Sequence, residues 1–331
     1  MRAEEEFPNE VVVNTSTSLI LSGFLLLLGI LVLCWFLWAA GGDPKGTGSR
    51  DAFGSTITVA DIAKRFTPSW APGPTIFPQR QTNRASKSPL YRIVWTFLIG
   101  WFALTGIFQI MAATIESIEV LREAEQLRAA QYACIALVLC GLWIVVFRIN
   151  SMTDKEIEEQ KRKSNVSSAE KDIRHVETKK SEWFWLATLI LFSAFLFAVL
   201  ADAVVQAWTL PSRQYGMMLF VAPLYGLFAG WLLYATSLSL GITIASESYP
   251  DGTVEVPENA NAMSYQGSLV PVVASIVAVC LAIATPDPLL PFPMALAIGL
   301  FAPRDFYNNV STIVCLLAMV LAGLRIYALR Q

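Results

Sequence analysis

Charged side chains are scarce in this chain of 331 residues. Asp, Glu, Lys and Arg together make up 15% of it, whereas soluble domains average about 25%. Of these 50 residues, 16 fall between positions 154 and 182, so the rest of the chain is poorer still. A net charge of −2 argues against a nucleic-acid binder, and an apolar content of 55% argues against a disordered chain. The composition indicates a protein that lies mostly in lipid.

Metal-binding and catalytic patterns are also missing from the sequence. The single histidine, His175, lies in the most hydrophilic segment, and the cysteines lie in apolar runs without CxxC spacing. A metal site needs several convergent ligands, so we predict no metal or other cofactor and assign the cysteines to packing. No glycine-rich phosphate loop and no nucleophile elbow occur. We therefore expect that the protein is not an enzyme. The cysteines are Cys34, Cys134, Cys140, Cys280 and Cys315.

Long apolar runs dominate the chain instead. A helix rises 1.5 Å per residue, so about 20 apolar residues cross a hydrocarbon core of about 30 Å. Eight runs are candidates: 19–40, 93–113, 133–149, 183–208, 217–245, 269–284, 289–302 and 310–329. The seventh has 14 residues and contains Pro291 and Pro293 near its start, so we expect a helix there that is short or broken. The sequence predicts an all-α polytopic transmembrane bundle with seven or eight spanning segments.

The charge pattern divides the chain into four parts. We predict an N-terminal tail (1–18), a first membrane part (19–149, helices 1–3), a charged extramembrane segment (150–182) and a second membrane part (183–331, helices 4–8). Of 18 loop cations, 15 lie in the proline-rich loop 41–90 and in the charged segment. The positive-inside rule then places both on the cytoplasmic-type side, opposite the N-terminus. The charged segment begins with a capping box at Thr153–Glu156 and is expected to form a solvated helical hairpin or extension.

Several tryptophans lie further inside their apolar runs than others do. Trp95, Trp143 and Trp231 differ in this from the tryptophans near helix ends, which are typical of the aromatic belt at a membrane interface. An indole N–H inside an apolar run needs a partner or a ligand. Together the three predict an aromatic-lined cavity between helices.

Several motifs carry a resemblance to a known family. Residues 66–72 read FTPSWAP and lead to VWTFL at 94–98, while LFAGWLLYAT at 227–236 contains the pattern GWxxxAT. Pro223 and Tyr225 precede it, and Trp143 occupies the intervening helix. In this order the motifs resemble the tryptophan-rich sensory protein or translocator protein family (TspO/MBR-related), in its longer seven- to eight-helix form. Ser239 departs from the family, which usually has an asparagine there.

The resemblance implies a sensor or binder whose cavity takes an apolar or planar tetrapyrrole- or sterol-like ligand. The residues expected to contact it are Trp95, Trp143, Tyr225, Trp231 and Tyr234. Two alternatives remain: a secondary transporter of a small molecule, and an accessory subunit of a larger membrane complex. The expected partners are membrane lipid, the ligand, and either further copies of the chain or a membrane complex, but no nucleic acid.

Asp202 is the one acidic residue well within an apolar run. Ionisable residues inside a membrane are functional candidates by default. Two interpretations stay open from the sequence: a proton relay, or an interfacial carboxylate near Gln206.

Overall fold

The computed structural model describes residues 15–39, 89–114, 123–163, 166–209, 215–248, 265–301 and 306–330. Every element within these ranges is helical, and none of these residues lies in a strand. The elements are α1 (Thr15–Ala39), α3 (Pro89–Thr114), α4 (Glu123–Lys163), α5 (Val166–Thr209), α6 (Tyr215–Ser248), α7 (Tyr265–Ala284), α8 (Phe292–Leu296), the π-helical segment η2 (Ala297–Phe301) and α9 (Phe306–Arg330). The predicted all-α bundle is confirmed.

Six of these helices are long and apolar enough to cross a membrane. They are α1, α3, α4, α5, α6 and α9, and α7 carries a shorter apolar stretch, Leu269–Ala284. By length, the described part of the chain thus falls short of the seven or eight expected spans unless α7 is counted. The protein is an integral, multi-pass membrane protein.

The expected break in the seventh apolar run is confirmed. α8 has five residues and passes directly into five residues of π-helix. Pro291 is the N-cap residue of α8, and prolines occupy its start. A proline has no N–H to donate to the preceding turn, so it is favoured at the start of a helix and weakens or kinks a helix in its interior. The run therefore forms a short segment after α7 and not another spanning helix.

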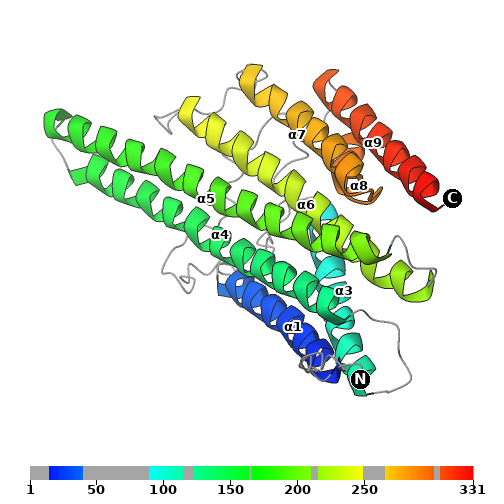
Figure 1. Ribbon diagram of the computed structural model, residues 1–331. Coiled ribbons are helices and arrows are strands. Elements are labelled where there is room, and N and C mark those ends of the chain that lie inside the picture. The colour runs from blue at the N-terminus through cyan, green and yellow to red at the C-terminus, as the bar shows by residue number, and fades with distance from the viewer. Residues whose placement is uncertain are drawn as a thin grey trace, which may run out of the picture.

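α6 lies at the centre of the bundle, and most of its spanning stretch is buried. It contacts α5 and α3 on one side and α7 and α8 on the other (Figure 1). α9 contacts α7, α8 and η2 and leaves most of its spanning stretch exposed. Side chains such as Phe306 and Tyr327 of α9, and Leu300 of the neighbouring η2, are strongly exposed, which suits contact with lipid tails.

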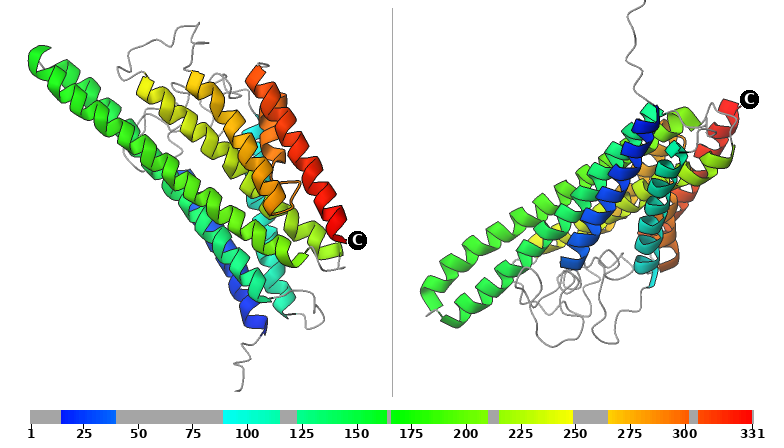
Figure 2. Two further views of the ribbon diagram at one scale, coloured as in Figure 1. Left: turned by 45° about the horizontal axis from the view of Figure 1, so that its top comes forward. Right: turned by 90° about the horizontal axis from the view of Figure 1, so that it is seen from below.

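The charged segment forms the helical hairpin that the sequence predicts. α4 continues to Lys163 and α5 begins at Val166, so both helices extend past their apolar stretches, which end at Val146 and begin at Phe184. The two extensions run side by side and project beyond the rest of the bundle (Figures 1 and 2).

Candidate functional site

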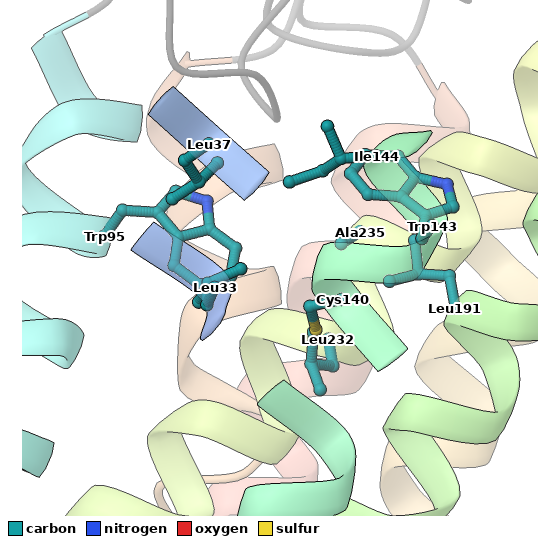
Figure 3. Close-up of a pocket in the computed structure, with 9 residues that line it drawn as sticks. All are labelled: Leu33, Leu37, Trp95, Cys140, Trp143, Ile144, Leu191, Leu232 and Ala235. Atoms are coloured by element: carbon teal, nitrogen blue, oxygen red, sulfur yellow. The ribbon is translucent and has the colours of Figure 1, made fainter. Parts of the chain in front are cut away.

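An apolar cavity lies between five helices, near one end of their spanning stretches. Trp95 of α3 and Trp143 of α4 stand on opposite sides of it, and Leu232 and Cys140 lie between them (Figure 3). The space inside it is about 10 Å³ for water-sized occupants, or room for about one water molecule. The complete lining is Leu33, Leu37, Trp95, Cys140, Trp143, Ile144, Leu191, Leu232 and Ala235.

No lining residue is charged, so the cavity favours an uncharged, apolar occupant. Trp95 and Trp143 are almost fully buried, at 8% and 3% exposure. Their indole rings offer flat walls with few rotamers to restrict when a ligand binds. Between the rings, aliphatic side chains from α1, α4, α5 and α6 complete the surface.

Trp231 and Tyr234 lie beside the cavity and not among its lining residues. The ring of Trp231 meets that of Trp95 edge to face, with centroids 6.3 Å apart. The ring centroids of Tyr234 and Trp231, both on α6, lie 5.5 Å apart. The Nε1 atoms of Trp95 and Trp231 are buried, and neither has a hydrogen-bond partner among the described residues. Trp231 thus supports Trp95 from behind, and α6 presents Leu232 and Ala235 to the cavity.

Tyr225 belongs to a separate aromatic contact in the core. Its ring packs edge to face on Phe102 at 5.8 Å, and Phe102 also meets Phe228 at 5.0 Å. Tyr225 is completely buried and does not line the cavity. Of the five residues predicted from the sequence, the structure therefore places Trp95 and Trp143 at the cavity, Trp231 and Tyr234 behind it, and Tyr225 elsewhere.

Sequence reasoning missed the aliphatic part of the lining. Leu33, Leu37, Leu191 and Ala235 belong to apolar runs in which nearly every residue is of the same kind. Which of them faces a cavity and which faces lipid depends on how the helices are rotated against their neighbours. The tryptophans were distinguishable because a buried indole N–H is uncommon in such a run.

Asp202 lies on α5 and is completely buried. The expected neighbour is Gln206, and it is confirmed, because Gln206 Nε2 donates a hydrogen bond to Asp202 Oδ1 at 3.3 Å. The sequence did not single out Asp287, which contacts Asp202 from the segment between α7 and α8. Asp287 stands between Pro286 and Pro288, a pattern that is typical of an ordinary turn. The available signal was an acidic residue directly after an apolar run.

Among the residues that the structure describes, no group of three or more His, Cys, Asp or Glu side chains is placed to hold a metal ion. Comparison of the chain with models of known protein families, with curated proteins and with solved structures finds no significant match. The resemblance to the tryptophan-rich sensory proteins stays a prediction, and the function must be argued from the geometry.

Proposed function

We propose that this multi-pass membrane protein binds a small, flat, apolar molecule in the cavity between Trp95 and Trp143. The observation that carries the proposal is the pairing of two buried indole rings across a space without charged walls. The protein then acts as a binder or sensor and not as an enzyme, since the cavity offers no nucleophile and base in contact.

The size of the cavity restricts the class of ligand. Ligand sites range from about 300 to 1,000 Å³, whereas this cavity, at about 10 Å³ for water-sized occupants, has room for about one water molecule in this conformation. Binding of a molecule of two or three fused rings therefore requires the helices that carry Trp95 and Trp143 to separate. A tetrapyrrole or a sterol, which the family resemblance implies, requires the helices around Trp95 to separate further.

Binding can be tested with 1-aminoanthracene, a flat apolar fluorophore, added to the purified protein in lipid nanodiscs. We expect saturable binding, read from the emission of the probe. Trp95→Ala and Trp143→Ala should each weaken the affinity about tenfold, equivalent to ~1.4 kcal/mol, because each removes one stacking wall. Trp35→Ala is the matched control, since Trp35 is 57% exposed on α1, packs on its neighbour Phe36 and does not line the cavity.

A cavity-filling variant separates loss of binding from loss of a tryptophan. Ala235→Phe places a ring in the cavity and keeps both walls, so it should abolish saturable binding. Equal, non-saturable uptake of the probe by all variants would mean partitioning into lipid and would contradict the proposal. Protoporphyrin IX, titrated in parallel, tests the larger ligand class.

A further inference from the structure

Two acidic side chains meet inside the bundle, away from the aromatic cavity. Asp202 comes from α5, and Asp287 from the segment that joins α7 to α8. Their exposures are 0% and 2%. Asp202 lies five residues before the end of the apolar stretch of α5 at Ala207, or ~7.5 Å along the helix axis. Leu191, which lines the cavity, lies 11 residues earlier on the same helix, so the two sites are ~16 Å apart along α5.

Each carboxyl group has one oxygen that is satisfied and one that is not. Gln206 Nε2 donates to Asp202 Oδ1 at 3.3 Å, and the backbone N–H of Leu289 donates to Asp287 Oδ1 at 2.8 Å. The two carboxyl groups also lie close enough to interact with each other. Neither Oδ2 atom receives a hydrogen bond from any residue in the described ranges. Two acceptors thus meet without a hydrogen atom between them.

Nearby titratable groups do not supply that hydrogen atom. In the second half of α5 Asp202 is the only titratable residue, and in the segment 285–301 Asp287 is the only one. The first half of α6 contributes Tyr215 and Tyr225 and no charged residue, and the hydroxyl of Tyr225 has no partner among the described residues. α7 contributes Tyr265 and the exposed Cys280. No Lys, Arg or His among the described residues is paired with either aspartate.

Two ionised carboxylates in buried contact repel each other strongly, and such pairs elsewhere retain a proton between them. We propose that Asp202 and Asp287 form a proton-binding site, in which one proton is held between the two carboxyl groups. The proton supplies the donor that both Oδ2 atoms lack. It also joins the segment after α7 to α5, which is far from it in the sequence.

The surroundings suit a proton better than a metal cation. A cation of the sodium or calcium type takes several oxygen ligands, but only two carboxyl groups converge here, and Gln206 approaches with its N–H₂ group. The backbone carbonyls of Thr285 and Leu289 already accept bonds from Asp287 N–H and Phe292 N–H, at 2.6 and 3.3 Å. Few oxygens remain free to complete a metal shell.

Gly226 allows this geometry, because a Cβ atom at that position of α6 would overlap the carboxyl group of Asp287. Burial, the largest cause, raises the pKa of Asp287 to about 6. A second proton should therefore bind as the pH falls through about 6. The pKa of Asp287 is raised relative to the unfolded chain, so protonation of this group contributes to the stability of the fold. That contribution should be complete below pH ~4. This contribution should be lost as the pH rises to about 6.

Infrared spectroscopy of the protein in nanodiscs between pH 8 and pH 4 tests the site directly. We expect a protonated-carboxyl C=O band at pH 7 that grows as the pH falls through about 6. Asp202→Asn and Asp287→Asn should each abolish the band at pH 7, because the remaining carboxylate gains an amide donor. Glu125→Gln, on α4 and outside the site, should leave it unchanged.

Gln206→Leu keeps both aspartates and serves if the asparagine variants do not fold. It removes a donor to the carboxylate form, so the titration should shift to higher pH. Absence of the band at pH 7 in the unaltered protein, or its persistence in both asparagine variants, would overturn the proposal. Loss of the band when sodium chloride replaces choline chloride at constant pH would also overturn it, since the ligand would then be a sodium ion.

Discussion

Gly226 and Gly230, one turn apart on α6, allow the segment after α7 to lie directly on that helix. A Cβ atom at Gly230 would overlap the backbone carbonyl of Leu290, as one at Gly226 would overlap Asp287. Gly100 and Gly323 face open space instead. A side chain is thus excluded at Gly226 and Gly230, whereas there is room for one at Gly100 and Gly323.

Gly230→Ala should destabilise the protein by about 1 to 3 kcal/mol, the usual cost of overpacking a tight contact. Gly100→Ala and Gly323→Ala should be neutral, or stabilising by up to about 1 kcal/mol through helix propensity. Unfolding curves in mixed micelles with increasing dodecyl sulfate measure the difference. Equal stability of all three variants would contradict the close contact at Gly230.

At the scale of the individual helices, hydroxyl side chains hold α5 to α6. Thr188 Oγ1 on α5 lies 2.9 Å from both Ser239 Oγ and Thr243 Oγ1 on α6, and Thr236 Oγ1 donates to the Leu191 carbonyl at 3.3 Å. Between helices in lipid such bonds contribute about 0.6 kcal/mol on average and at most about 1.7 kcal/mol. Ser239, where the resemblance leads us to expect an asparagine, is therefore part of a helix contact.

Thr188→Val should lower the free energy of unfolding by about 1 kcal/mol, because it removes both contacts to α6 without changing the shape of the side chain. Ser193→Ala is the control, since Ser193 Oγ donates only to Leu189 O of its own helix. A double-mutant cycle with Ser239→Ala isolates the pair. Additive losses would show that Thr188 and Ser239 are not coupled.

The arrangement of the helices in the whole molecule bears on how the bundle is oriented across the membrane. The cavity brings together Leu37 near the end of α1, Trp95 near the start of α3, and Trp143 near the end of the apolar stretch of α4. The described helix ends next to both basic segments of the sequence therefore lie at the cavity end of the bundle. At the other end, Ser22 Oγ donates to Gln109 Oε1 at 2.9 Å, and Gln109 Nε2 donates to Gln126 Oε1 at 2.9 Å, which ties α1, α3 and α4 together.

Single cysteines at positions 55 and 168, in a variant whose native cysteines are replaced, should react with an impermeant maleimide from the same side of sealed vesicles. The reason is that 15 of the 18 loop cations lie in these two segments, which the positive-inside rule keeps on one side. A cysteine in the N-terminal tail should react only from the other side. Reaction of positions 55 and 168 from opposite sides would refute this orientation.

The positions of the apolar helices along the chain were determined by the sequence alone. Apolar length and the prolines Pro291 and Pro293 at the start of α8 are local signals that produced the elements they predicted, whereas α4 runs through the capping box at Thr153–Glu156 without a new helix start. Of the three tryptophans expected at an aromatic cavity, Trp95 and Trp143 line it, whereas Trp231 packs on Trp95 and does not.

Only the tertiary structure decided which residues meet. Asp202 and Asp287 are 85 positions apart, and nothing local indicates that a turn between prolines reaches the end of α5. The rotation of α6 turned Leu232 and Ala235 toward the cavity and Trp231 toward Trp95, a choice that a helix apolar on all sides does not encode. The physical reason is that side chains of one kind surround such a helix, so its orientation depends on the fit to its neighbours, above all at Gly226 and Gly230.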